Sequence, residues 1–289
     1  MRKVFLTFGD GGENFILASH RLALEAKATK QFDEIIECNW SSITNDKVLQ
    51  SPLRQYKRGC GYWLWKPAII YSTLSKLEDG DILVYCDAGD ILYDSKRQWR
   101  LFFAQLKKVD LICKRISACN LHRCRKELLE KFGMSCGICG RLCYQYEMNA
   151  VFLKKTQFTL ALIKEWLDFM LEYPDLIRDT IGSVEESAQL PTYIENRHDQ
   201  SVFSLIVSQK FSDKSVCNKI KTIWEFHTGW WLLGNPCISS ARIRGADRPK
   251  IGFKARLIRL LYRILWRFQL FLEHKGVCLF WEKGGYYGA

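Results

Sequence analysis

The chain has 289 residues, of which 48% are hydrophobic, 13% aromatic and 26% charged, and it contains only 6 prolines. This length and composition suffice for a large hydrophobic core and exclude a disordered or collagen-like chain. We expect no secretory leader and no membrane-spanning helix, so the 12 cysteines are interpreted as reduced thiols of a cytoplasmic protein. The net charge of +12 is uneven, because residues 242–289 hold eleven Lys or Arg against three Asp or Glu. This asymmetry indicates that the end of the chain meets a membrane surface or a nucleic acid.

Alternating apolar runs and helical periodicity predict an α/β order of elements. In chain order, the pattern predicts a strand at 3–8, a helix at 14–30, a strand at 34–38, a helix at 67–77, a strand at 81–86, a helix at 96–107, strands at 110–114 and 150–153, and helices at 156–171 and 199–208. A glycine-rich break at 9–12 follows the first strand, and a loop is expected at 173–197. A β-loop-α-β start is typical of a parallel, nucleotide-binding sheet.

Asp87 follows the buried strand at 81–86 and precedes two small residues, Ala88 and Gly89. Ligands of open α/β sheets lie beyond the carboxyl ends of the strands. A carboxylate there can reach a divalent cation or a ribose, while the small neighbours let a diphosphate come close. The alternative is that Asp87 and Asp90 only cap the turn that follows.

The run RGCGYWLWKP at 58–67 combines two glycines with three aromatic rings and two cations. Aromatic faces can stack on a base or a sugar, and Arg58 or Lys66 can pair with phosphate oxygens. The alternative places Trp63 and Trp65 in the core at the start of a helix. Residues two apart in a helix cannot both face the same site, so we expect at least one of these tryptophans to lie in the core.

Four polar residues, at 195–198, precede the helix predicted at 199–208, and Asp199 stands at its start. A carboxylate at a helix amino terminus can cap the helix, or it can accept a proton from an acceptor hydroxyl. His227 is a second candidate, which would complete a metal site with Asp87 or else pack as an ordinary histidine.

Four runs together, RGCGYWLWKP, DGDILVYCDAGD, EMNAVFLKKT and ENRHDQSVFSLI, resemble the bacterial capsule and O-antigen polysaccharide glycosyltransferases of the GT-A fold, over roughly residues 3–210. The resemblance implies an α/β, Rossmann-like GT-A fold with a mostly parallel central sheet flanked by helices. It also implies transfer of a sugar from a nucleotide diphosphate donor, UDP-linked, to a hydroxyl of a lipid-linked or growing polysaccharide. We therefore expect a catalytic domain at 1–240 and a basic amphipathic tail at 241–289.

The resemblance also implies roles for individual residues. Donor binding is expected at Thr7, Phe8, Gly9, Arg58, Tyr62, Trp65, Lys66, Asp87, Ala88 and Gly89. Acceptor binding is expected at Asn149, His198 and Gln200. If the enzyme inverts configuration, the base that deprotonates the acceptor is Asp199 or, second, Glu147. Phe8 either stacks on the nucleobase or belongs to the core.

We expect Asp87, Asp90 and His227 to bind Mn²⁺ or Mg²⁺. The family usually carries Asp-x-Asp, and here the third position is Gly89. Asp87 then holds a metal alone or with help from Asp90 or His227. In the alternative, Asp87 only touches the ribose, and cations such as Lys66 neutralise the diphosphate.

The tail carries a stripe of arginines at helical spacing, Arg256, Arg259, Arg263 and Arg267, with apolar residues between them. This pattern predicts a basic amphipathic helix that lies on anionic lipid at the inner face of the cytoplasmic membrane, where lipid-linked acceptors are found. The alternative is a core-packed helix with solvated arginines.

A cysteine-rich stretch suggests a second kind of metal site, one that binds zinc. The alternative is that these cysteines are scattered thiols without a shared role. The residues are Cys119, His122, Cys124, Cys136, Cys139 and Cys143.

Two other functions compete with the transferase. An inactive glycan-binding or scaffold protein would explain the missing second Asp. A nucleic-acid-binding protein would explain the sequence pI of about 9.1, but the excess charge lies in an apolar helix, so no nucleic-acid partner is expected.

Overall fold

The computed structural model describes residues 1–134, 144–226 and 235–247, together with Leu261 and Ile264. Within them, a six-stranded central sheet has the strand order β2-β1-β3-β6-β5-β7. Its strands are β1 (Lys3–Phe8), β2 (Glu34–Cys38), β3 (Ile82–Cys86), β5 (Leu111–Cys119), β6 (Tyr144–Lys154) and β7 (Ile220–Ile223). The β1·β2, β1·β3 and β5·β7 pairs are parallel, and β6 runs antiparallel to both of its neighbours. A two-stranded sheet pairs β4 (Asp90–Leu92) with β8 (Ile238–Ser240).

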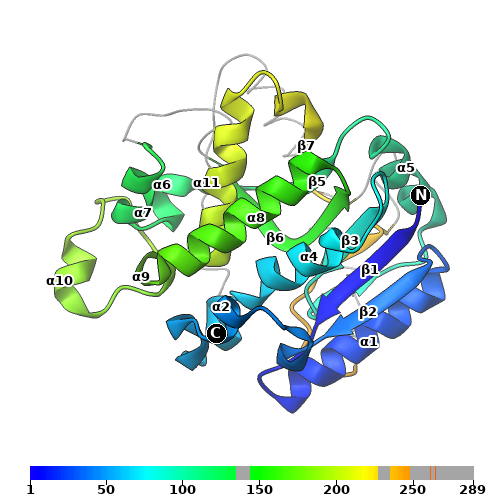
Figure 1. The fold of residues 1–289 in the computed structure, drawn as a ribbon, viewed down its shortest axis with the longest axis horizontal. Helices are drawn as coiled ribbons and strands as arrows, with labels where there is room; N and C mark the ends of the chain where they lie inside the picture. The colour runs from blue at the N-terminus through cyan, green and yellow to red at the C-terminus, as the bar shows by residue number, and fades with distance from the viewer. Residues whose placement is uncertain (135–143, 227–234, 248–260, 262–263, 265–289) are drawn as a thin grey trace.

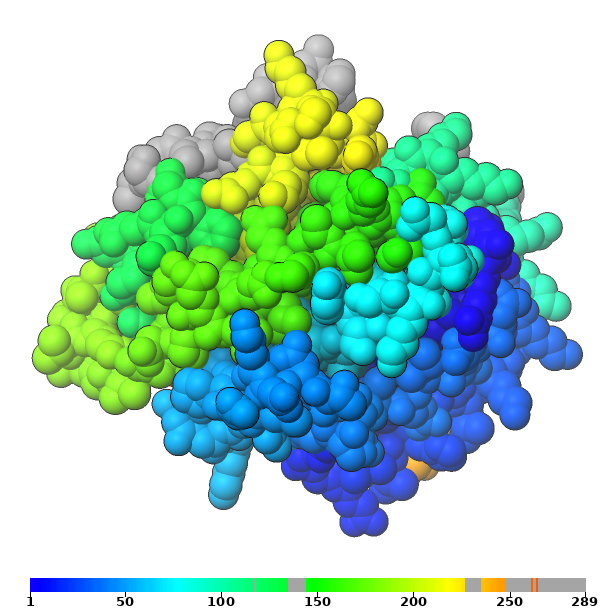
Figure 2. All heavy atoms as spheres, in the orientation of Figure 1, coloured from blue at the N-terminus to red at the C-terminus, as the bar shows by residue number. Residues whose placement is uncertain are grey.

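Helices cover both faces of the central sheet (Figure 1). On one face lie α4 (Trp65–Ser75), α8 (Gln157–Glu172) and α11 (Asp199–Ser212), which pack on Leu83 and Tyr85 of β3. On the other face lie α1 (Glu13–Thr29) and α5 (Lys96–Gln105), which pack on the alternate residues of the same strand. Every residue of β3 is consequently buried, as in sheets covered on both sides. Figure 2 shows α4 and α8 as a continuous layer over their face.

Shorter helices fill the connections. They are η1 (Trp40–Ser42), α2 (Asp46–Leu49), η2 (Pro52–Gln55), α3 (Gly59–Tyr62), α6 (Asn120–Arg123), α7 (Lys126–Lys131), α9 (Pro174–Ile177), α10 (Gly182–Ser187) and η4 (Cys217–Lys219).

The expected fold class, α/β with a mostly parallel central sheet flanked by helices, is confirmed. Two expectations were wrong in detail. The strand predicted at 150–153 begins at Tyr144, because polar residues alternate with buried ones along its first half. The loop predicted at 173–197 contains the short helices α9 and α10.

The arginine stripe of the tail lies outside the described residues, as do Cys136, Cys139, Cys143 and His227. Between those arginines, Leu261 and Ile264 expose 52% and 47% of their surface. Cys119 and Cys124 are buried thiols, and burial raises the pKa of Cys124 to about 12. In the part of the chain that the structure describes, no helix is long and apolar enough to cross a membrane.

Phe152 tests the core on the α1 and α5 side of the sheet. Its ring is fully buried and lies 5.4 Å from Phe102, 5.9 Å from Trp99 and 5.5 Å from Phe226 between centroids. We expect Phe152→Ala to lower the free energy of unfolding by about 3–5 kcal/mol, because it leaves a cavity among rings that cannot close on it. Urea denaturation followed by circular dichroism measures the loss. Val184→Ala, at a site that is 80% exposed, should leave the midpoint unchanged.

Candidate active site

A crevice is expected where β1 and β3 lie side by side in the sheet. The two strands are parallel, and from β1 the chain continues to β2 on one side while β3 lies on the other. The loop at 9–12 and the turn at 87–89 therefore leave the sheet at the same edge. In open α/β sheets, ligands bind at such a switch point beyond the carboxyl ends of the strands.

Gly9 brings the end of β1 against α1. Its N–H donates to the carbonyl of Cys38 at 2.9 Å. A Cβ at this position would lie 2.4 Å from Ser19 Cβ and 2.8 Å from the carbonyl oxygen of Phe15, so only glycine fits without moving the helix. This close approach fixes where the loop at 9–12 leaves the sheet.

The other two residues predicted at the end of β1 are buried. The Phe8 ring is 4% exposed and stacks on Trp65 at 3.8 Å and 8° between ring planes, so Trp65 covers one of its faces. Of the two alternatives that the sequence allowed for Phe8, the structure shows the one in the core. Thr7 is fully buried, and its hydroxyl has no hydrogen-bond partner among the described residues.

Lys66 lies at the centre of the charged groups at this edge of the sheet. Its side chain is 4% exposed, and its Nζ lies 3.0 Å from Asp87 Oδ1 and 3.3 Å from Asp199 Oδ2. The same ammonium donates to the carbonyl oxygen of Met148 at 3.1 Å. Three protein partners thus surround a group with three N–H donors. Lys66 joins the first turn of α4 to the end of β3, to β6 and to the start of α11.

The charges of this cluster depend on burial and on one another. Burial acts to lower the pKa of Lys66, but Asp199 and Asp87 outweigh it and raise that pKa, so the ammonium stays charged. Burial raises the pKa of Asp199 to about 6, against the opposing effect of Lys66. The Oδ2 atom of Asp199 makes an ion pair and no hydrogen bond among the described residues. Asp199 is therefore a carboxylate that can take up a proton near neutral pH.

Asp87 is the more accessible acid of the cluster, with 31% of its side chain exposed. Its carboxylate accepts hydrogen bonds from the Tyr85 hydroxyl and from Lys66. Its backbone N–H donates to the carbonyl of Asn149 at 2.6 Å, which holds the turn against β6. Burial, and then the charge of Asp87, raise the pKa of Tyr85 well above its ordinary value, so the phenol remains a donor.

The described residues do not fit the divalent cation site that the sequence predicted. Asp90 is 2% exposed, both of its oxygens accept from the Asn149 amide at 3.0 Å, and burial raises its pKa well above the ordinary value. The Asp87 carboxylate already forms an ion pair with the Lys66 ammonium, and His227 lies outside the described residues. Among the residues that the structure describes, no group of three or more His, Cys, Asp or Glu could hold a metal ion.

Gly89 occupies the third position of the expected Asp-x-Asp for a steric reason. A Cβ there would lie 3.1 Å from Arg242 Cα and 3.3 Å from the backbone nitrogen of Ile243. That nitrogen also donates to the carbonyl of Gly89 at 2.9 Å. The backbone of a segment from the end of the described chain, residues 238–245, thus packs closely on this position, and a side chain here would require it to shift by a few tenths of an ångström. We call this segment the strap.

Residues 59–63 form a left-handed turn beside the cluster. All five have positive φ, including the non-glycine residues Cys60, Tyr62 and Trp63 at 50°, 50° and 59°. Each such residue costs about 1–2 kcal/mol, so the surrounding contacts must impose this conformation. The indole of Trp65 donates to the carbonyl of Gly59 at 3.0 Å and contributes one of these contacts.

The turn presents Tyr62 and Trp63 to His198. Trp63 stacks on the imidazole at 5.4 Å between centroids, and His198 itself has a φ of 54°. The Tyr62 hydroxyl donates to Asp179 Oδ2 at 3.0 Å, and Arg58 makes an ion pair with the same oxygen at 3.0 Å. Burial lowers the pKa of His198 to about 4, so the imidazole is neutral at pH 7.

The predicted acceptor residues lie along β6 and at the start of α11. Glu147 makes an ion pair with Lys114 at 2.5 Å, and Gln200 donates to Gln145 Oε1 at 2.7 Å. The Asn149 amide donates to Ser240 Oγ of the strap at 2.6 Å as well as to Asp90. These contacts place Asn149 beside the Asp87 turn. In the described part of the chain, Glu147 pairs with Lys114 and Gln200 with Gln145, and neither side chain forms a hydrogen bond or ion pair with Lys66.

Sequence reasoning missed several residues of this site. They are Tyr85, Met148, Asp179 and the strap. Tyr85 carried a signal, since a hydroxyl two residues before Asp87 on the same strand points to the same face. Met148 acts through its backbone, and Asp179 and the strap arrive from distant parts of the chain, so no local pattern marks them.

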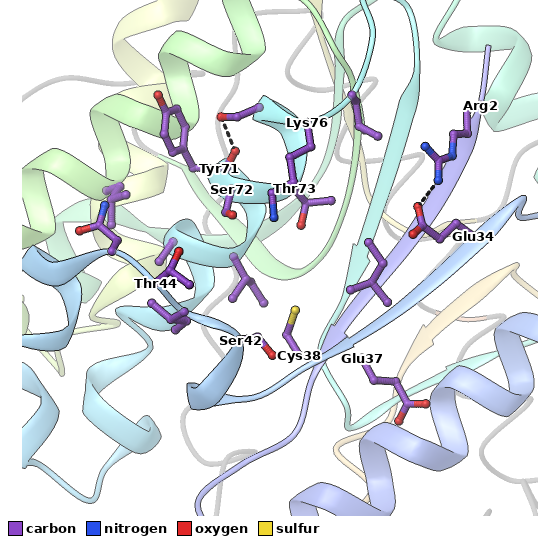
Figure 3. Close-up of a pocket in the computed structure, with 18 residues that line it drawn as sticks. Arg2, Glu34, Glu37, Cys38, Ser42, Thr44, Tyr71, Ser72, Thr73 and Lys76 are labelled. Atoms are coloured by element: carbon purple, nitrogen blue, oxygen red, sulfur yellow. Dashed lines mark hydrogen bonds and ion pairs between the residues drawn. The ribbon is translucent and has the colours of Figure 1, made fainter.

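A cavity of about 610 Å³ lies elsewhere, between β2, the segment that follows it and α4 (Figure 3). Cys38 and Ser42 face Thr73 and Lys76 across it, and an exposed Arg2–Glu34 ion pair lies at one end. Burial raises the pKa of the Cys38 thiol, which disfavours a thiolate nucleophile. None of the predicted site residues lines this cavity.

No protein-family model and no curated protein matches the sequence. Solved structures match at low identity. A glycosyltransferase involved in glycosylation of the major capsid of PBCV-1 is 9% identical over 60% of this chain and 69% of that chain, with a TM-score of 0.31.

Two further solved structures are similar to the same degree. The galactosyltransferase LgtC, in complex with donor and acceptor sugar analogues, is 13% identical over 71% of this chain and 70% of its own, with a TM-score of 0.36. Mouse xyloside xylosyltransferase 1 is 11% identical over 82% and 96%, with a TM-score of 0.39. At these identities, the chemistry of the site is interpreted from its own residues.

Lys66→Met tests whether the buried ammonium holds the cluster together. The variant keeps the bulk of the side chain but leaves Asp87 and Asp199 without their cation, so we expect a loss of about 3–5 kcal/mol in unfolding free energy at pH 7.5. Asp199, without the cation that lowers its pKa, should then bind a proton more readily in the folded state. Stability should therefore rise as the pH falls, and the deficit should shrink at pH 5.

Denaturant titrations of both proteins at pH 7.5 and pH 5 measure this difference. Lys164→Met, which removes an exposed pair with Asp168, should leave the midpoint unchanged at both pH values. An equal deficit at both pH values would show that Lys66 acts by packing alone.

Proposed function

We propose that the chain is a glycosyltransferase that moves a sugar from a nucleotide diphosphate sugar, UDP-linked, to a hydroxyl of a lipid-linked or growing polysaccharide in capsule, O-antigen or other cell-surface glycan synthesis. The observation that carries this proposal is the Lys66–Asp87–Asp199 cluster, which lies at the switch point between β1 and β3. The resemblance of the four sequence runs to polysaccharide glycosyltransferases supports it independently.

The proposed reaction forms a bond between an acceptor oxygen and the anomeric carbon of the donor sugar. The bond from that carbon to the phosphate oxygen breaks, and its electron pair leaves with the nucleotide diphosphate. In an inverting reaction, the proton of the acceptor hydroxyl passes to a carboxylate. Asp199 fits this role best, because burial raises its pKa to about 6 and its Oδ2 lacks a hydrogen bond among the described residues. Glu147 is the second candidate.

The remaining side chains bind and orient the two substrates in this proposal. Asp87 is partly exposed and can accept a hydrogen bond from a ribose or sugar hydroxyl, with Lys66 holding its orientation. Thr7, Phe8 and Gly9 shape the donor side from the end of β1. Asn149, His198 and Gln200 belong to the acceptor side. No step is assigned to Mn²⁺ or Mg²⁺, because the described donor groups do not fit such an ion.

We further propose that residues 1–240 form the catalytic domain and that residues 241–289 attach it to the inner face of the cytoplasmic membrane. The arginine stripe of the tail and the exposed Leu261 and Ile264 support this attachment, since basic amphipathic helices bind anionic lipid. A lipid-linked acceptor would then lie at the same surface.

An inactive glycan-binding or scaffold protein is the second candidate function, since Gly89 replaces the second aspartate. Incubation with UDP-, GDP- and CMP-sugars, with and without Mn²⁺, separates the two by release of free sugar or nucleotide. We expect turnover of at least one donor, and a drop of about 100-fold or more in Asp87→Asn. Lys164→Met should turn over at the wild-type rate. Absence of turnover with every donor would favour the inactive protein.

The pH dependence of turnover tests Asp199 as the base. A base must be deprotonated to act, so kcat/KM should rise with pH and level off above an inflection near 6, the value to which burial raises its pKa. The groups that face Asp199 are Lys66 from α4 and Asp87 from the end of β3. Asp199→Asn should lose about 100-fold or more in rate together with the inflection.

Glu147→Gln is the matched variant for this profile. If Asp199 is the base, Glu147→Gln keeps the inflection near pH 6. Loss of the inflection in Glu147→Gln alone would move the base to Glu147, and a flat wild-type profile would point to a reaction that needs no base.

A further inference from the structure

The segment that follows β3 carries Asp87 and continues into β4, and its backbone is held from two sides. Within the segment, the N–H of Asp90 donates to the carbonyl of Asp87 at 2.9 Å. From the strap, the N–H of Ile243 donates to the carbonyl of Gly89, also at 2.9 Å. Ala88 and Asp90 are buried, so their carbonyls require donors from another element.

Arg21 and Glu25 of α1 bond this segment from the other side. They lie one helical turn apart, and Arg21 Nη1 donates to Glu25 Oε1 at 2.8 Å. Arg21 Nη2 donates to the carbonyl of Ala88 at 2.7 Å and to that of Asp90 at 2.8 Å. Glu25 Oε2 accepts from the N–H of Leu92 at 2.8 Å. The pair, which we call the α1 clamp, therefore contacts both ends of the segment 88–92.

The α1 clamp restricts the turn that carries Asp87. Only 8% of the Arg21 side chain and 14% of the Glu25 side chain are exposed. A buried ion pair stabilises a fold little more than apolar residues of similar volume would, so stability alone does not account for this pair. The two carbonyls that Arg21 bonds stand on either side of Gly89, whose backbone is intrinsically the least restricted of the turn. The planar guanidinium therefore limits the directions in which the turn can orient the Asp87 carboxylate.

We propose that Arg21 is a positioning residue of the donor site, which acts through Asp87. By holding the carbonyls on either side of Gly89, it keeps the Asp87 carboxylate on the Lys66 ammonium, 3.0 Å away, and available to the proposed donor. The inference rests on the proposed function and extends the site to α1, a helix that holds none of the predicted site residues. Precision of this kind matters, because a misplacement of about 1 Å can lower a rate about 100-fold.

A double-mutant cycle of Arg21→Lys and Asp87→Asn tests this role. Lysine keeps a positive charge beside Glu25, but one ammonium cannot reproduce the two-nitrogen geometry of the guanidinium. For the sugar donor that wild type turns over, we expect Arg21→Lys to lower kcat/KM by about tenfold or more. In the Asp87→Asn background it should change kcat/KM by less than about twofold, because the carboxylate that Arg21 positions is already gone.

The pH profile gives a second readout, which a purely structural role would leave unchanged. Burial raises the pKa of Asp199 to about 6, the Lys66 ammonium opposes this rise, and the charge of Asp87 adds to it. Displacement of Asp87 in Arg21→Lys should therefore shift the inflection of kcat/KM to lower pH. Losses of kcat/KM that multiply in the double variant, or an unchanged inflection, would overturn the proposal.

Arg125→Lys is the matched control. Arg125 is also buried, with 6% of its side chain exposed, and it donates to the backbone carbonyl of Asp175 at 3.1 Å. This variant should keep kcat/KM within about twofold of wild type and leave the inflection in place. An equal loss of kcat/KM in Arg125→Lys and Arg21→Lys would contradict a specific role for Arg21.

Glu25→Gln is the second variant if Arg21→Lys does not fold. Its amide oxygen can still accept from the N–H of Leu92, whereas the ion pair that orients the guanidinium is lost. It should lower kcat/KM in the wild-type background and not in the Asp87→Asn background. Equal losses in both backgrounds would overturn the proposal.

The outcomes separate this proposal from the proposed function. Turnover of a donor with undiminished kcat/KM in Arg21→Lys would support the transferase and contradict the role of Arg21. If wild type turns over no donor, the transferase is contradicted, and the urea midpoints of the same four proteins test the α1 clamp instead. A midpoint shift in the double variant that is smaller than the sum of the single shifts would support action through Asp87, and shifts that add would contradict it.

Discussion

The arrangement of the site depends on one buried ammonium. Lys66 lies within 3.3 Å of carboxylates that come from the end of β3 and the start of α11, and it also bonds the backbone of β6. A lone buried charge of either sign would be strongly unfavourable, so each member of this cluster requires the others. The same group therefore fixes the relative position of four elements and opposes the rise that burial causes in the pKa of Asp199. The fold around the site and its proposed chemistry therefore both depend on the Lys66 ammonium.

A second constraint is backbone strain, which the structure concentrates around this cluster. Residues 59–63 and His198 all have positive φ, and the two segments meet in the stack of Trp63 on the imidazole. Asp179 contacts both segments, because it accepts from the Tyr62 hydroxyl and its Oδ1 lies 3.5 Å from His198 Nε2. The left-handed turn leads directly into α4, so it determines where Lys66 enters the core. The strain is compensated by the contacts that place this ammonium.

Much of the fold was predictable from the sequence, because β1 and β3 are covered on both faces and appear as continuous apolar runs. The first half of β6 was missed, although Gln145, Glu147 and Asn149 alternate with buried residues there. For the candidate site, the sequence predicted roles for Lys66, Asp87 and Asp199 but not their pairing, which depends on tertiary contacts between distant segments. The two glycines at 59 and 61 can adopt positive φ at little cost, whereas the positive φ of Tyr62 and Trp63 depends on their packing.

Position 89 shows how a sequence comparison and a structure can lead to different interpretations of one residue. Against the Asp-x-Asp pattern, Gly89 is a missing metal ligand, which suggests an impaired enzyme. In the structure, Gly89 is a closely packed position, since a Cβ there would lie 3.1 Å from Arg242 Cα and 3.3 Å from the backbone nitrogen of Ile243. A side chain at 89 would therefore require the strap backbone to shift by a few tenths of an ångström. A missing ligand and a close backbone contact are thus two interpretations of the same glycine, and only the second follows from the contacts of this chain.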